Sequence, residues 1–119
     1  MIKRLHVGTR LSEAAIVAGT IYLAGQVPEQ HPDADIETQT REVLGHIDRL
    51  LAECGSSKAH LLSVQIYLAD IAEIARMNAV WDAWVAPGHT PPRATVQARL
   101  ADPRWRIEVV AVVRQIEVE

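Results

Sequence analysis

The sequence has few of the features that mark specialised classes of protein. It contains a single cysteine, Cys54, so no intramolecular disulfide can form and nothing indicates secretion. No apolar run approaches the roughly 20 residues that a membrane-spanning helix needs. Residues 1–10 also lack the apolar stretch of a signal peptide. We therefore expect a cytoplasmic protein with no membrane partner.

The sequence also lacks an excess of positive charge. Twelve basic and fifteen acidic side chains give a formal net charge of -3, which argues against a protein whose main work is neutralising phosphate backbones. Hydrophobic residues make up 49% of the chain, which excludes disorder and fits a compact fold. Because of the negative net charge, we expect no nucleic-acid partner. A length of 119 residues leaves room for one core, so we expect a single domain over residues 1–119.

Motifs for metal ions and nucleotides are missing too. The six glycines match neither phosphate-binding fingerprint. The histidines stand far apart without paired spacing, so we expect no metal site and no cofactor. We expect surface or loop positions for all five: His6, His31, His46, His60 and His89.

Hydrophobic periodicity in the first half of the chain predicts two strands and a helix. Residues 14–17 and 20–23 are apolar or β-branched, with a hairpin turn at Ala18-Gly19 between them. A helix follows the loop after Gln26, with Asp35 and Glu37 near its start and Gly55 at its end. The apolar stripe of this helix comprises Val43, Leu44, Ile47, Leu50, Leu51 and Cys54. We therefore expect the Cys54 thiol to be buried and unreactive.

The second half predicts three strands around another helix. Residues 61–68 and 93–99 alternate between apolar and polar side chains, and residues 106–116 form the strongest strand candidate. Asp70 is predicted to cap the second helix, with Glu73 completing an acidic capping box and Pro87-Gly88 ending the helix. The buried stripe of this helix comprises Ile71, Ile74, Met77, Trp81, Trp84 and Val85. We expect its two tryptophans to pack in the core and not to stack on nucleic-acid bases.

The unbroken apolar run 109–113 predicts a strand that is covered on both faces. Two amphipathic helices can cover one face of a sheet this small. The element order is strand, strand, helix, strand, helix, strand, strand, which leaves nothing in the chain to cover the other face. We therefore expect an α+β layer that oligomerises through its open sheet face.

Two charged residues in apolar strands are the candidates for chemistry. Arg93 begins one strand and Glu108 interrupts another. A guanidinium can hold a small carboxylate bidentately, and a carboxyl among valines is suited to exchange protons with a water molecule. The pattern is equally compatible with an internal Arg93–Glu108 ion pair, or with exposure of both side chains at strand ends.

Four segments of the chain resemble a known family. Residues 92–97 and 107–109 resemble the C-terminal signature of the reactive-intermediate deaminase family (RidA-like, YjgF), which older usage calls L-PSP endoribonuclease. Gly25-Gln26-Val27-Pro28 resembles its glycine-glutamine-x-proline turn, and residues 77–84 also align. The sequence of residues 81–85 looks most like that of the YoaB-like branch of the family.

The resemblance implies a fold, an assembly and an activity. The fold would be chorismate-mutase-like, a small mixed sheet with two helices on one face, assembled as a homotrimer with ligand sites between subunits. The activity would be hydrolysis of enamines and imines, such as 2-aminoacrylate, to 2-keto acids and ammonia without metal or cofactor. Arg93 would hold the substrate carboxylate and Glu108 would handle the water and the proton. Gly25, Thr95 and Asn78 would line the pocket.

The chain departs from the family pattern at three pocket positions. Leu11 replaces a tyrosine, Ala24 replaces a serine, and Thr95 stands where a cysteine is frequent. The lost tyrosine hydroxyl removes one hydrogen-bond donor, so we expect a more apolar wall there. The alternative to a deaminase is a non-catalytic protein that binds or senses small carboxylates through Arg93. A third function, RNA cleavage, has little support because the basic residues are scattered along the chain. Hydrolysis requires Glu108, whereas binding requires Arg93 alone.

Overall fold

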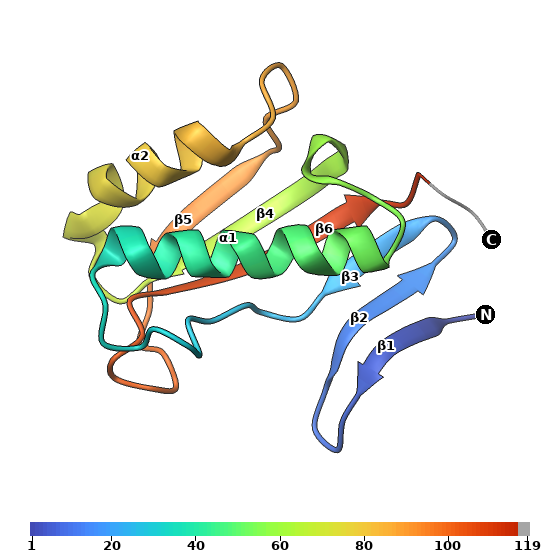
Figure 1. Ribbon diagram of the computed structural model, residues 1–119, viewed down its shortest axis with the longest axis horizontal. Coiled ribbons are helices and arrows are strands. Elements are labelled where there is room, and N and C mark those ends of the chain that lie inside the picture. Colours follow the sequence, from blue (N-terminus) through green and yellow to red (C-terminus); the bar gives the residue numbers. More distant parts are fainter. Residues whose placement is uncertain (117–119) are drawn as a thin grey trace.

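The computed structural model describes residues 1–116 as a six-stranded mixed sheet with two helices packed on one face (Figure 1). The strand order is β1-β2-β3-β6-β4-β5, and β4 and β5 form the one parallel pair among the described strands. This α+β architecture confirms the predicted fold class. The elements are β1 (Lys3–Val7), β2 (Ser12–Val17), β3 (Thr20–Leu23), α1 (Ile36–Glu53), β4 (Leu61–Leu68), α2 (Ile74–Trp84), β5 (Arg93–Gln97) and β6 (Ile107–Arg114).

The predicted β2–β3 hairpin is confirmed, but the strand before it was not predicted. Ala18 and Gly19 both have positive φ, 51° and 78°, as the two central residues of a type I′ turn require. The strand β1 pairs only with β2, at the edge of the sheet. Its side chains are mostly exposed, so its sequence lacks the apolar alternation that reveals a half-buried strand.

Both ends of α1 follow the sequence signals. The Asp35 side chain accepts a hydrogen bond from Thr38 N at 2.9 Å, and this bond holds the pKa of Asp35 below its ordinary value. Gly55, directly after the helix, has a φ of 74°, which a glycine adopts without strain. Cys54 is buried as expected, and burial raises the pKa of its thiol.

The start of the second helix differs from the prediction. Asp70 caps a short 3₁₀ turn, Ile71–Glu73, and α2 begins only at Ile74. Glu73 does not close a capping box, because its carboxylate instead accepts hydrogen bonds from Arg106. Ile71 is exposed and lies outside the buried stripe, and the helix ends at Trp84, ahead of Pro87.

One histidine is not on the surface. His46 lies within α1 with 5% of its surface exposed, contrary to the prediction for all five histidines. Its ring nitrogens bond to Glu42 Oε2 at 2.9 Å and to Arg49 Nη2 at 2.8 Å. These two partners satisfy the imidazole, so the ring can be buried on the side of the helix that packs inward.

Burial along β6 alternates. Ile107, Val109, Ala111 and Val113 are buried beneath the helices, whereas Val110 and Val112 are half-buried on the opposite face. This open face is apolar. Tyr22 of β3 and Val112 of β6 are paired on it, and so are Tyr67 of β4 and Val96 of β5. Tyr22 and Val96 are 50% and 44% exposed. No described element of the chain covers these side chains (Figure 1). The structure therefore has the apolar, uncovered sheet face that we inferred from the unbroken apolar run of β6.

Gly45, in the middle of α1, provides a test of local stability. A Cβ built at this position meets no atom within 4 Å, and glycine costs a helix interior roughly 0.5–1 kcal/mol relative to alanine. Gly45→Ala is therefore expected to raise the free energy of unfolding by about that amount in chemical denaturation. Gly88→Ala is the matched control and is expected to lower it, because Gly88 has a φ of 78°. Equal effects of the two substitutions would contradict this explanation.

No helix within residues 1–116 is long and apolar enough to cross a membrane.

Candidate active site

Arg93, at the start of β5, is the half-buried arginine of the chain; the other arginines are exposed. Its guanidinium carbon lies 5.1 Å from the centre of the Trp81 ring on α2. Trp81 is itself buried, and its ring centroid lies 5.4 Å from that of Trp84. A guanidinium over an indole face is held by cation–π attraction, which orients it but leaves its N–H donors free for a carboxylate.

Two further predicted site residues on the same elements carry unsatisfied polar atoms. Asn78 lies one helical turn before Trp81 on α2, and Thr95 lies two residues after Arg93 on β5. Asn78 Oδ1 and Thr95 Oγ1 are buried, and neither has a hydrogen-bond partner among residues 1–116. Buried polar atoms are normally paired, so two orphans beside a half-buried guanidinium indicate a place for a polar ligand.

Glu108 and Gly25 form a second group. Glu108 is half-buried on β6, and no residue in the described part of the chain donates a hydrogen bond to its carboxylate. A Cβ at residue 25 would overlap Glu108 Oε2 and lie 3.0 Å from Glu108 Cδ. A side chain at residue 25 would therefore displace the Glu108 carboxylate, which rests directly against the backbone there.

The turn that follows β3 is tied to β6 next to Glu108. Gln26 N donates to Val109 O at 2.8 Å, and Val109 N donates to Gln26 O at 3.1 Å. The buried Gln26 side chain donates to Glu13 Oε2 at 3.0 Å and to Ala24 O at 3.1 Å. Ala24 N in turn donates to Glu13 O, and Leu11, which is 56% exposed, lies two residues before Glu13. Ala24 therefore belongs with the Glu108 group, whereas Leu11 is assigned to it by the family resemblance and not by a contact within residues 1–116.

The two groups lie on opposite faces of the sheet. Arg93 and Thr95 pair in parallel with Val64 and Ile66, which are buried beneath the helices. Glu108 pairs with Tyr67, whose side chain points to the open face. The paired positions also place Arg93 and Glu108 about 10 Å apart along the strands and about 10 Å apart across them. One chain therefore does not bring the two residues together.

This placement excludes one of the alternatives that the sequence leaves open, the internal ion pair. Arg93 and Glu108 form no ion pair with each other, and no carboxylate within residues 1–116 lies within ion-pair distance of Arg93. Neither side chain is fully exposed. Each is a half-buried charged group without an opposite charge in residues 1–116, so each is available to pair with a ligand.

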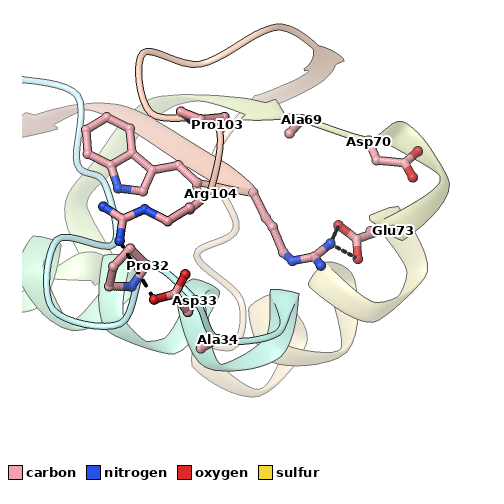
Figure 2. A pocket seen from close by; sticks show the side chains of 10 residues that line it. Pro32, Asp33, Ala34, Ala69, Asp70, Glu73, Pro103 and Arg104 are labelled. Carbon is pink, nitrogen blue, oxygen red and sulfur yellow. Dashed lines mark hydrogen bonds and ion pairs between the residues drawn. The ribbon is translucent and has the colours of Figure 1, made fainter.

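The charged groups of a neighbouring hollow are, by contrast, already paired. This hollow has a volume of about 300 Å³ and is lined mainly by the 3₁₀ turn, the loop before α1 and the loop before β6 (Figure 2). Arg106 Nη1 lies 2.8 Å from Glu73 Oε2, and Arg104 Nη2 lies 2.8 Å from Asp102 Oδ2. An incoming carboxylate would have to break these pairs. Elsewhere in residues 1–116, no group of three or more His, Cys, Asp or Glu side chains is placed to hold a metal ion.

Comparison with known proteins identifies the family. The sequence model of the family described as Endoribonuclease L-PSP matches residues 1–115. The chain belongs to the L-PSP endoribonuclease (YjgF) family. It is 48% identical to a RutC family protein of Haemophilus influenzae over 111 residues, which cover 93% of this chain and 96% of that protein. It is 43% identical over 111 residues, with the same coverage, to the RutC family protein YoaB of Escherichia coli.

A solved YjgF-family structure has the same fold. The protein from Neisseria meningitidis superimposes with a TM-score of 0.95 at 48% identity, covering 99% of this chain and 98% of that chain. The resemblance to the family and to its YoaB-like branch, first apparent in residues 25–28, 77–84, 92–97 and 107–109, is thereby confirmed.

Sequence reasoning missed Glu42, a residue of α1 that positions the chain after the YjgF-type turn. Its carboxylate accepts hydrogen bonds from Gln30 N at 2.9 Å and His31 N at 2.8 Å, and it also bonds to the rings of His31 and His46. Burial raises the pKa of Glu42, but the hydrogen bonds lower it by more, so the pKa lies below its ordinary value. The i,i+4 spacing of Glu42 and His46 was the available signal.

Glu42→Gln is expected to reduce stability most at neutral pH. A carboxyl whose pKa is depressed in the folded state stabilises the fold above its unfolded pKa, and this contribution disappears as the pH falls through the folded pKa. The variant is therefore expected to be about 1–3 kcal/mol less stable than wild type at pH 7, with the difference shrinking toward pH 3. Urea denaturation at several pH values measures this. A difference that stays constant with pH would show that the charge of Glu42 is not responsible.

Proposed function

We propose that the protein is a cofactor-independent enamine/imine deaminase that hydrolyses 2-imino acids to 2-keto acids and ammonia. The observation that carries the proposal is the pair of half-buried, unpaired charges, Arg93 and Glu108. Membership of the YjgF family supports the same reading. The substrate carboxylate would accept two hydrogen bonds from the Arg93 guanidinium, whose orientation is fixed by Trp81.

We further propose that each site forms between two copies of the chain in a homotrimer. Because Arg93 and Glu108 lie on opposite faces of one sheet, a substrate a few ångströms long cannot contact both in one chain. A neighbouring copy packed against the apolar open face would bring its own Arg93 group to the Glu108 group. Arg93, Thr95 and Asn78 would then come from one subunit, and Glu108, Gly25, Ala24 and Leu11 from the next.

The proposed chemistry requires one positioned water and one proton carrier. The water oxygen forms a bond to the imine carbon, C2, while Glu108 accepts a proton from that water and the imine nitrogen takes up a proton. In the resulting carbinolamine the C–N bond breaks as the C2 hydroxyl becomes a carbonyl. Glu108 returns its proton to the leaving nitrogen, which departs as ammonia, and the hydroxyl proton passes to solvent, replacing the proton that the imine nitrogen took from solvent. General acid–base catalysis of this kind contributes typically 10²–10⁴-fold.

The pocket favours substrates with apolar side chains. Leu11 presents an aliphatic side chain that is 56% exposed in the single chain, and Ala24 offers no hydroxyl. Neither residue can donate a side-chain hydrogen bond to a polar substituent. An imine from an aliphatic amino acid such as leucine or methionine is therefore a better candidate substrate than one with a polar side chain.

A coupled assay tests the activity. An L-amino-acid oxidase generates 2-imino acids, semicarbazide traps them as semicarbazones, and a deaminase competes for the same imine. The protein is expected to reduce the rate of semicarbazone formation, most strongly with aliphatic amino acids. Failure to do so with every amino acid, combined with saturable binding of a keto acid that Arg93→Ala abolishes, would replace the proposal with the carboxylate-binding alternative.

A further inference from the structure

A groove between α1 and α2 lies apart from the proposed active site. It has a volume of about 420 Å³, within the range of small-molecule sites. Trp84 lines it, and the buried Trp81 separates Trp84 from Arg93. Its mostly apolar floor is formed by residues of both helices: Leu44, Gly45, Ala79, Val80, Ala83 and Trp84.

Small residues leave the floor of the groove uncovered. A Cβ at Gly45 would meet no atom within 4 Å, so the space above the middle of α1 is open. Ala79 and Ala83 face it from α2 and are exposed. A planar ring or an alkyl chain could therefore lie along the groove against the Trp84 indole, where it would remove apolar surface from water.

The charges at the rim favour an anion. Glu37 is engaged by Arg76 in two hydrogen bonds of 2.9 and 2.7 Å, and Asp48 accepts the Trp84 Nε1 hydrogen at 2.9 Å. Arg41 and Lys58 have no carboxylate within ion-pair distance in the described part of the chain. Arg76 thus neutralises Glu37, whereas Asp48 keeps its charge, so the rim carries two cations without a carboxylate partner against one unneutralised carboxylate.

We propose that the α1–α2 groove binds a small organic anion with an apolar body, a carboxylate or sulfonate carried by a ring or an alkyl chain. The apolar body contacts Trp84 and the floor, and the anionic group lies within reach of Arg41 or Lys58. Lys58 Nζ already lies 5.2 Å from the centre of the Trp84 ring, so an anion on that ring has a cation beside it. This site is independent of the proposed deaminase activity.

Two probes with the same ring system separate charge from apolar contact. 8-Anilinonaphthalene-1-sulfonate carries an anion, whereas N-phenyl-1-naphthylamine is neutral, and the fluorescence of both rises on binding. We expect the wild-type protein to bind one sulfonate per chain. Gly45→Leu fills the groove with a good helix former and is expected to weaken binding of both probes at least about tenfold without lowering stability.

Charge variants test the anion preference. Arg41→Gln combined with Lys58→Gln is expected to weaken sulfonate binding about three- to tenfold and to leave the neutral probe unchanged, while the exposed Arg99→Gln control changes neither. Arg93→Ala is expected to bind both probes as wild type does. Unchanged binding by Gly45→Leu, loss of binding by Arg93→Ala, or equal affinity for both probes would overturn the proposal. A drop in solution mass caused by Gly45→Leu would also overturn it, because a second copy would then occupy the groove.

Discussion

Replacing Arg93 with alanine and, separately, Glu108 with glutamine is expected to abolish most imine hydrolysis for two different reasons. Arg93→Ala removes the guanidinium that we propose binds the carboxylate, and losing one partner of such a pair costs about 2–5 kcal/mol, which corresponds to roughly 30- to 4,000-fold in kcat/KM. Glu108→Gln keeps the shape of the side chain but cannot carry a proton, so kcat is expected to fall about 10²–10⁴-fold. The semicarbazide assay measures both.

Ligand binding distinguishes the two variants. Glu108→Gln is expected to bind a keto acid such as 2-oxobutyrate nearly as well as the wild type, because Arg93 is intact, whereas Arg93→Ala is expected to lose binding as well as turnover. Both substitutions lie at half-buried positions outside the core, so the circular dichroism spectra are expected to match that of the wild type. Full turnover by Glu108→Gln would remove Glu108 from the mechanism.

The largest stability effect is expected at Gln39, a fully buried residue of α1. The two hydrogens of its Nε2 are shared among the carbonyl oxygens of Pro32, Ala34 and Arg104, which lie 3.0–3.1 Å away, and its Oε1 accepts from Arg106 N at 2.7 Å. This one side chain therefore joins the loop before α1 to the chain that enters β6. Gln39→Met leaves these backbone groups unpaired and is expected to lower the free energy of unfolding by about 3–5 kcal/mol.

Two other glutamine variants control for this explanation. Gln39→Glu keeps the acceptor for Arg106 N but loses the amide donors, so it is expected to destabilise the protein as well. Gln97 is exposed and accepts one hydrogen bond, from Ile71 N at 3.0 Å, so Gln97→Met is expected to cost about 1 kcal/mol or less. Urea denaturation at one fixed protein concentration measures all three. A cost at Gln39 no larger than at Gln97 would contradict the assigned role.

Much of the fold follows from local signals in the sequence. The Ala18-Gly19 turn, Gly55 at the end of α1 and the apolar stripe of α1 each specify a local conformation, and the structure confirms all three. The strand β1 escaped prediction because an exposed edge strand needs no apolar alternation. The start of α2 was misplaced because Asp70 caps a 3₁₀ turn as readily as an α-helix, and sequence spacing does not separate the two.

The candidate site was predictable in composition but not in arrangement. Arg93 and Glu108 stand out as charged residues in apolar strands, and the family resemblance adds Gly25, Asn78 and Thr95. Their separation onto two faces depends on strand order and register, which arise from long-range pairing. The burial of His46 could not be predicted either, because it depends on its partners Glu42 and Arg49.

Mixed assemblies of two variant chains test the composite site of the proposed homotrimer most directly. Arg93→Ala and Glu108→Gln chains, co-expressed with different tags and purified through both, give trimers that contain both variants. If each site takes Arg93 from one subunit and Glu108 from its neighbour, every mixed trimer contains one intact site of three. Imine hydrolysis is then expected to recover to about one third of the wild-type rate. If both residues acted from the same chain, no site would be intact, and activity no higher than that of the separate variants would contradict the account.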